Sequence, residues 1–251
     1  MILLKIIGSD YDGTLNHNGI DDKKIRALEK WREKGNIFAL ISGRGPENLK
    51  KIYNDKPFPC DYLIANNGAV ILKTDGTVIS DIKCDGKLIK PLIKLLFKNK
   101  CPWANIDTYT PCRIYPDSSD CKDDDDYTLE NMPEIEYFNQ ISTFLPDFET
   151  AAQVTENIRK EFGDKLNPLQ NGVCIDTVRA DMNKAIGLHK LMKYTGAAHK
   201  DIIAVGDNIN DSDMIREFRS YAMENGVDEI KKLADYVTPG ITELIEKELT
   251  E

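Results

Sequence analysis

Two carboxylates close together near the start of the chain have the spacing of a catalytic pair. They lie in Ser9-Asp10-Tyr11-Asp12-Gly13-Thr14-Leu15, directly after an apolar run, and Gly13 supplies the backbone freedom of a tight turn. One carboxylate could act as a nucleophile while the other, further along the turn, transfers protons. A plain acidic turn is the alternative. An EF-hand calcium loop would need a further oxygen ligand before its glycine.

A second acidic segment offers oxygen ligands for a metal ion. In Gly206-Asp207-Asn208-Ile209-Asn210-Asp211-Ser212-Asp213, the carboxylates of Asp207 and Asp211 are four residues apart and the Asn210 amide can donate. Hard oxygen ligands of this kind suit Mg²⁺. Asp211 and Asp213 would also be favourable in the first turn of a helix, and helix capping is the simpler interpretation for Asp213.

Two further segments could bind an anion. The Ser42 hydroxyl and the Gly43 N–H follow an apolar run and could hold a phosphate oxygen near a helix N-terminus, although Ser-Gly is also a common turn. Lys184 begins an expected helix, where a cation opposes the helix dipole. It could be aimed at a phosphate, and the alternative is a solvated surface lysine.

Short apolar runs alternate with amphipathic stretches, which predicts an α/β fold with a parallel sheet. In such sheets functional groups collect at the carboxyl ends of the strands. Asp21 is expected to cap the first helix and Gly35 to end it. The Asp75-Gly76 pair predicts a hairpin between residues 70–72 and 78–79. The expected strands of the core are residues 3–7, 37–41, 62–65, 202–205, 221–223 and 236–237, and the expected helices begin near residues 22, 46, 183, 212 and 228, with one more at the C-terminus.

The alternation of apolar runs and amphipathic stretches becomes less regular between about residues 84 and 178. There we expect helices over 88–97 and 151–162, a hairpin near Trp103 and Arg113, a strand over 173–178 and a solvated acidic loop over 123–126. We predict a core formed by residues 1–82 and 180–251, with a second α+β domain inserted at 83–179. Such an insertion often places a ligand site between the two parts.

Composition limits the possible partners. The 251 residues carry 42 acidic and 33 basic side chains, a net charge of −9, which argues against binding to nucleic acid. No run approaches the roughly 20 apolar residues that span a bilayer, and residues 1–7 lack the features of a signal peptide. Six cysteines without a C-x-x-C pair favour reduced thiols over a disulfide or metal cluster. We expect a cytoplasmic protein without membrane partners.

These segments together resemble the haloacid dehalogenase (HAD) superfamily. Asp10-x-Asp12-Gly-Thr-Leu, Ser42, Lys184 and Gly206-Asp207-x-x-Asn210-Asp211 occur in the order of that family. The chain length and Asn66-Asn-Gly-Ala69 are similar to the Cof-type sugar-phosphatase branch. The resemblance implies a Rossmann-like parallel-sheet core with an inserted cap of type C2. It also implies a Mg²⁺-dependent phosphatase for a small phosphorylated metabolite, most simply a sugar phosphate, acting as a monomer or weak homodimer.

The resemblance also assigns roles to residues. Asp10 would be the nucleophile and Asp12 the general acid and base. Mg²⁺ would be held by Asp10, by the main-chain carbonyl of Asp12 and by Asp207, with Asp211 either a ligand or an orienting group. The residues expected around the phosphoryl group are Tyr11, Ser42, Gly43, Lys184 and Asn210. Those expected to contact the rest of the substrate are Arg44, Asn67 and Arg113, with Trp103, Tyr109 and Tyr115 as further candidates in the cap.

Two other functions share these features. A phosphomutase of the same superfamily uses the same pair of aspartates, although Ile41-Ser-Gly-Arg44 looks more like the hydrolases. A non-catalytic phosphate-binding module is disfavoured because both Asp10 and Asp12 are present. Dehydrogenases and P-loop kinases are disfavoured because neither glycine-rich motif occurs.

Overall fold

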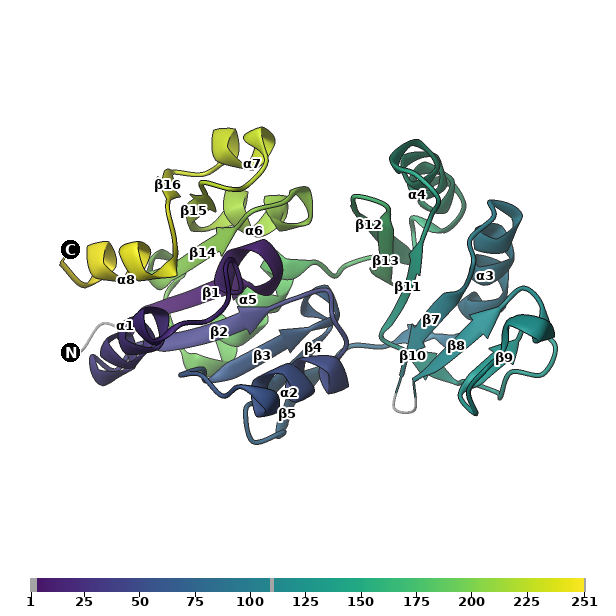
Figure 1. The fold of residues 1–251 in the computed structure, drawn as a ribbon, viewed down its shortest axis with the longest axis horizontal. Helices are drawn as coiled ribbons and strands as arrows, with labels where there is room; N and C mark the ends of the chain where they lie inside the picture. Colours follow the sequence, from purple (N-terminus) through teal and green to yellow (C-terminus); the bar gives the residue numbers. More distant parts are fainter. Residues whose placement is uncertain (1–3, 109–110, 251) are drawn as a thin grey trace. The chain divides into compact units, whose positions relative to one another are not determined.

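An eight-stranded sheet forms the first of the two units into which the chain divides (Figure 1). The computed structural model describes residues 4–108 and 111–250. The first unit comprises Met1–Ser80 and Lys184–Glu251, and the second comprises Asp81–Asn183. No helix among the described residues combines the length and the apolar character needed to cross a membrane.

The sheet of the first unit is mainly parallel, as predicted. Its order is β16-β15-β14-β1-β2-β3-β4-β5; the pairings from β16 to β3 are parallel, and β3 pairs with β4 antiparallel. In Figure 1, purple β1 lies beside green β14 although the two are far apart in the sequence. The strands are β1 (Ile6–Asp10), β2 (Ile37–Ile41), β3 (Tyr62–Ala65), β4 (Val70–Lys73), β5 (Val78–Asp81), β14 (Ile202–Gly206), β15 (Arg219–Met223) and β16 (Tyr236–Thr238).

Helices cover both faces of this sheet, which explains why β2, β3 and β14 are almost entirely apolar. Residues of α5 and α6 share one buried cluster with alternate residues of the strands, such as Ala204 and Ala222. The neighbouring Tyr221 points the other way, because its hydroxyl donates to Glu248 of α8. The helices are α1 (Asp22–Glu33), α2 (Pro46–Asp55), α5 (Lys184–Thr195), α6 (Ser212–Glu217), α7 (Asp228–Leu233) and α8 (Ile241–Thr250).

The parallel register places the carboxyl ends of three strands at one edge of the sheet. β1 ends at Asp10, opposite Ile41 at the end of β2, while Ser9 is opposite Val205 of β14. The first strand is displaced from its expected position at residues 3–7, of which Leu3 lies outside the described residues. It runs on through Gly8, Ser9 and Asp10, all of which are buried. The acidic motif therefore begins inside the strand.

The second unit has an α+β fold, as predicted for the insertion. Its six-stranded sheet has the order β12-β13-β11-β7-β8-β9, and α3 and α4 contribute to the same buried cluster as its strands. The elements are β6 (Cys84–Asp85), α3 (Ile89–Lys98), β7 (Ala104–Asp107), β8 (Cys112–Tyr115), β9 (Asp126–Thr128), β10 (Tyr137–Phe138), β11 (Gln140–Phe144), α4 (Phe148–Phe162), β12 (Leu166–Asn171) and β13 (Cys174–Arg179). Strands β6 and β10 pair separately.

A buried carboxylate fastens the C-terminal helix to the core sheet. The Glu248 side chain, only 1% exposed, accepts hydrogen bonds from the Tyr221 hydroxyl (2.6 Å), Arg219 Nε (2.7 Å) and Lys5 Nζ (3.2 Å). Burial alone would raise the pKa of Glu248, but these three donors outweigh it and lower the pKa below its usual value.

Replacement of this carboxylate gives a prediction with a definite pH dependence. Because the folded-state pKa of Glu248 is depressed, its stabilisation is present above the unfolded pKa of about 4.3 and is lost as pH falls through the folded value. Glu248→Gln is expected to lower the free energy of unfolding by about 1.5–3 kcal/mol at neutral pH. Urea denaturation of both proteins should show this difference shrinking below about pH 4. A difference that is constant with pH would contradict the assignment.

Candidate active site

The turn after β1 is shaped by one glycine. Gly13 has a φ of +84°, and a Cβ at this position would lie 2.4 Å from Oδ2 of Asp207. The close approach lets the Thr14 hydroxyl donate to Asp207 Oδ1 at 2.7 Å. It also leaves the Gly13 carbonyl accepting from the Asn225 side chain at 2.9 Å. Only glycine therefore allows the first acidic segment to rest directly against the second.

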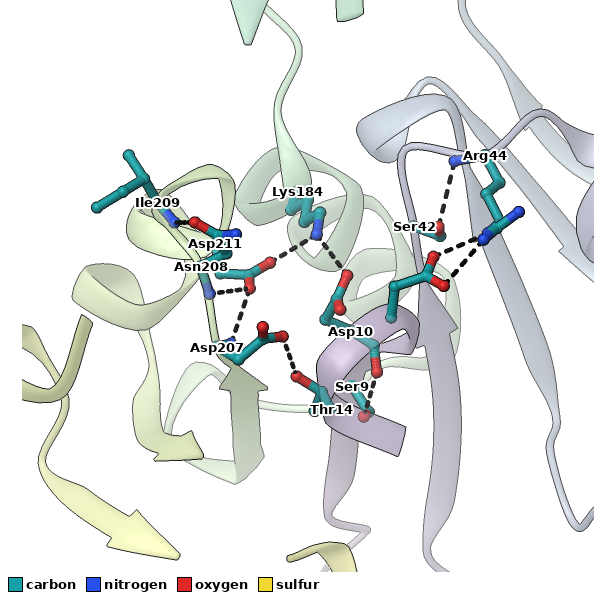
Figure 2. A network of polar contacts seen from close by, with 11 residues as sticks. Ser9, Asp10, Thr14, Ser42, Arg44, Lys184, Asp207, Asn208, Ile209 and Asp211 are labelled. Atoms are coloured by element: carbon teal, nitrogen blue, oxygen red, sulfur yellow. Dashed lines mark hydrogen bonds and ion pairs between the residues drawn. The ribbon is translucent and has the colours of Figure 1, made fainter. Parts of the chain in front are cut away.

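Lys184 joins the two acidic segments from the start of α5. It is completely buried, and its ammonium donates to Asp10 Oδ1 at 2.6 Å and to Asp211 Oδ1 at 2.5 Å. Figure 2 shows the amine pointing between these two carboxylates. Lys184 is thus not a solvated surface lysine, and its unfavourable place at a helix N-terminus is offset by two ion pairs.

Burial and charge act against each other in this cluster. Burial alone would lower the pKa of Lys184, but the carboxylates of Asp10 and Asp211 more than offset this and raise it. Burial raises the pKa of Asp10 to about 8, with the Asp211 and Asp207 charges adding to the rise and Lys184 opposing it. Burial likewise raises the pKa of Asp207, against the hydrogen bond from Thr14. The cluster therefore holds more negative charge than Lys184 alone can balance.

Asp211 serves the local backbone as well as Lys184. Its Oδ2 accepts from the backbone N–H of Asp207 at 3.0 Å and of Asn208 at 3.2 Å, and Asn208 completes a capping box with it. Asp211 therefore caps the short 3-10 turn Ile209–Asp211 rather than α6, and it also contacts Lys184. Asp213 lies in the first turn of α6, as expected.

The donor set fits a hard divalent cation. One carboxylate oxygen from each of Asp10, Asp207 and Asp211 lies within 4.8 Å of the others, the one such group of His, Cys, Asp or Glu found in the described residues. All three are hard oxygen ligands, and a divalent cation would balance the excess negative charge. The Asp12 side chain is not part of this group.

Asp12 is held instead by Arg44. The guanidinium donates from Nε to Asp12 Oδ2 at 2.8 Å and from its terminal nitrogen to Oδ1 at 2.9 Å. It also lies over the Tyr11 ring, 5.9 Å from the centroid. The sequence suggested that Arg44 contacts substrate, and the structure shows that it makes a bidentate pair with an expected catalytic carboxylate. That pairing was not anticipated.

The turn after β3 is tied to the segment after β2. Asn66 and Asn67 are buried and have consecutive positive φ angles of 48° and 52°, a strained arrangement that is typical of functional sites. The backbone N–H of Asn67 donates to the carbonyl of Ser42 at 3.0 Å. Ser42 is itself buried, and its hydroxyl accepts from the Arg44 backbone N–H. Asn67 and Ser42 are therefore brought together.

The remaining expected residues have the following surroundings. Asn210 is partly buried, immediately before Asp211. Arg113 belongs to the second unit, where its guanidinium lies 5.2 Å from the Trp103 ring centroid and donates to the Tyr115 hydroxyl at 3.3 Å. Tyr109 lies outside the described residues.

Sequence reasoning missed two contributors, Thr14 and Asn225, which hold the first acidic segment against the second. Thr14 stands inside the first motif, so its position was a usable signal. Asn225 stands in no motif.

Comparison with known proteins gives the family of the chain. Residues 7–243 match the family model of haloacid dehalogenase-like hydrolases. A relative from Bacillus subtilis, named 5-amino-6-(5-phospho-D-ribitylamino)uracil phosphatase, is 24% identical over 94% of this chain and 90% of its own length.

Solved structures show the same fold. A haloacid dehalogenase-like hydrolase from B. subtilis superposes with a TM-score of 0.83 at 20% identity, covering 97% of this chain and 99% of that one. A HAD subclass IIB sugar phosphatase superposes with a TM-score of 0.79, also at 20% identity, covering 98% and 100%. The parallel core sheet with an inserted second-sheet unit is common to them.

Proposed function

The chain belongs to the haloacid dehalogenase-like hydrolase family and is a phosphatase of small phosphorylated metabolites; from this premise we propose that it hydrolyses a sugar phosphate through an aspartyl-phosphate. The observation that carries the proposal is the buried contact of Lys184 with Asp10 and Asp211 beside Asp207. A buried carboxylate at the end of β1, supported by an ammonium and further carboxylates, is suited to nucleophilic attack on phosphorus.

The two aspartates on the β1 turn divide the chemistry. A carboxylate oxygen of Asp10 forms a bond to phosphorus while the bond from phosphorus to the substrate oxygen breaks. Asp12 gives its proton to the departing alkoxide and then takes a proton from the water that attacks the acyl phosphate. The second step releases inorganic phosphate and restores the Asp10 carboxylate.

The groups around the phosphoryl oxygens supply positive charge and hydrogen bonds. A bound Mg²⁺ would offset the charge of the phosphate dianion. Its ligands would be the carboxylates of Asp10 and Asp207 and the main-chain carbonyl of Asp12, with Asp211 as a further ligand or as an orienting group. Lys184 favours the ionised form of Asp10, in opposition to burial, and holds one of its carboxylate oxygens by a hydrogen bond. The remaining donors in this proposal are the Ser42 hydroxyl, the Gly43 N–H, the Asn210 amide and the backbone at Tyr11.

We propose that the second unit (Asp81–Asn183) selects the leaving group, together with Arg44 and Asn67. Arg113 with Trp103 and Tyr115 offers a cation and aromatic rings suited to a polyol or a planar group. A sugar phosphate is consistent with the names of two similar proteins, a sugar phosphatase and a phosphatase whose named substrate carries a phosphoribityl chain.

Phosphate release from a substrate panel tests the function directly. With sugar phosphates, nucleotides and an aryl phosphate, we expect release in Mg²⁺ that falls to background in EDTA, because the carboxylate cluster requires a balancing cation. Sugar phosphates should give the highest kcat/KM. Isomerised sugar phosphate without free phosphate would favour a mutase, and binding without either product would favour a non-catalytic module.

Arg44 acts as a positioning residue for Asp12 in this scheme. Arg44→Ala is expected to lower kcat by roughly 10–100-fold, because Asp12 loses the bidentate contact that orients it. The thermal midpoint should change little, since the two side chains are 39% and 53% exposed and such pairs contribute about 0–1 kcal/mol. Arg44→Lys keeps the positive charge but cannot donate two parallel hydrogen bonds to the carboxylate, so it should recover only part of kcat. An unchanged kcat in Arg44→Ala would exclude the role.

A further inference from the structure

Two of the three histidines of the chain converge on one carboxylate of the first unit. His189 Nε2 lies 3.0 Å from Glu217 Oε1, and His199 Nε2 lies 3.2 Å from the same oxygen. The Phe218 ring lies beside both imidazoles, at centroid distances of 4.9 and 5.0 Å. His199 begins the short turn His199–Asp201 that leads into β14, so the cluster is near the amino end of that strand, whereas the candidate active site is at its carboxyl end.

The spacing of these groups resembles two edges of a coordination tetrahedron. Metal–nitrogen and metal–oxygen bonds of about 2.0–2.2 Å at tetrahedral angles separate neighbouring donor atoms by about 3.4 Å. The two observed nitrogen–oxygen distances are slightly shorter. The three donors are not all within 4.8 Å of one another, so one ring must turn toward the other. His199 has room to turn, because half of its side chain is exposed.

We propose that His189, His199 and Glu217 form a binding site for a first-row transition-metal ion such as Zn²⁺ or Cu²⁺, with water completing the coordination. Imidazole nitrogens select these ions over Mg²⁺, which prefers oxygen ligands. The site therefore differs in metal preference from the all-carboxylate cluster of Asp10, Asp207 and Asp211.

The three ligands come from elements that also carry active-site residues. His189 is on α5, which begins with Lys184. His199 precedes β14, which ends beside Asp207, and Glu217 is the last residue of α6, which follows Asp211. A metal ion at this site would join three segments that approach the active site from the opposite end of the sheet. Because it binds only the folded arrangement, it would raise the thermal midpoint of the first unit.

Copper binding tests the site without reference to turnover. The chain without any affinity tag is given saturating Mg²⁺, to occupy the carboxylate cluster, and then one equivalent of Cu²⁺. The electron paramagnetic resonance spectrum should show coupling to two imidazole nitrogens. His189→Gln and His199→Gln should each leave coupling to one nitrogen and weaken binding by on the order of tenfold or more. Glu217→Gln should weaken binding while both nitrogens remain.

His17 provides the matched control. It is the third histidine of the chain and lies in the loop after the first acidic motif, so His17→Gln should leave the spectrum and the affinity unchanged. Coupling to fewer than two nitrogens in the unaltered chain would overturn the proposal. So would a two-nitrogen spectrum that survives His189→Gln or His199→Gln. Neither result would bear on the phosphatase, because no step of the test depends on hydrolysis.

Discussion

Asp10→Asn is expected to abolish phosphate release while leaving the fold intact. The amide has nearly the shape of the carboxylate but cannot attack phosphorus, so kcat should fall by about 10⁴-fold or more. Stability should be unchanged or slightly higher, since burial already makes the charged form of Asp10 costly and Lys184 keeps its contact with Asp211. Phosphate release and a thermal denaturation curve, recorded on the same preparation, check both expectations.

Two further experiments, a second variant and a trapping experiment, test whether Asp10 itself is the nucleophile. Slow deamidation of asparagine would regenerate aspartate, so Asp10→Ala should be equally inactive and should not recover on storage. Mass spectrometry of rapidly quenched enzyme should detect one added phosphoryl group on the peptide containing Asp10, and none in either variant. Substantial turnover in freshly prepared Asp10→Ala would exclude Asp10 as the nucleophile.

Lys184→Met is expected to have the largest effect on stability. The substitution removes the ammonium that contacts Asp10 and Asp211, and it leaves buried carboxylates facing one another without a cation. Loss of one partner from a buried ion pair costs about 3–5 kcal/mol in the free energy of unfolding. Urea denaturation in EDTA measures this loss. The loss should shrink at lower pH, because protonation of Asp10, whose pKa burial already raises, removes part of the repulsion.

Mg²⁺ should rescue the stability of this variant more than its activity. A divalent cation at the carboxylate cluster can balance the charge that Lys184 no longer balances, so Mg²⁺ should stabilise Lys184→Met more than the unaltered protein. Lys193→Met, at an exposed position on the same helix, is the control and should change stability by about 0.5 kcal/mol or less. Equal stabilisation of Lys184→Met and the unaltered protein by Mg²⁺ would show that Lys184 and the metal ion do not balance the same carboxylates.

Strands β2, β3 and β14 were predictable because they are apolar on both faces. The boundaries of β2 (Ile37–Ile41) and β3 (Tyr62–Ala65) coincide with the predicted ones. In the second unit, β11 (Gln140–Phe144) and β12 (Leu166–Asn171) were missed because their polar residues obscure the pattern. Pro168 is unfavourable in the middle of a sheet, but β12 is at the edge of its sheet, where proline is tolerated.

The acidic motifs of the site were predictable from their residue types, whereas the partners of the charges were not. Spacing could place Asp10 and Asp207 at the carboxyl ends of their strands, because parallel strands align those ends. It could not show that Lys184 is fully buried between two carboxylates, or that Arg44 donates two hydrogen bonds to Asp12. Both contacts depend on side-chain directions that only the packed fold determines.

The position of β1 in its sheet has a consequence for how the protein is made. One side of β1 pairs with β2, which follows soon after it in the sequence. The other side pairs with β14, which is synthesised only after the entire second unit. During synthesis the second unit is contiguous and can complete its own sheet first. On an unfinished chain β1 therefore has an open edge with unpaired backbone groups, which favours aggregation. On the proposed mechanism, the nascent chain cannot hydrolyse a substrate before Asp207 and Asp211 have left the ribosome.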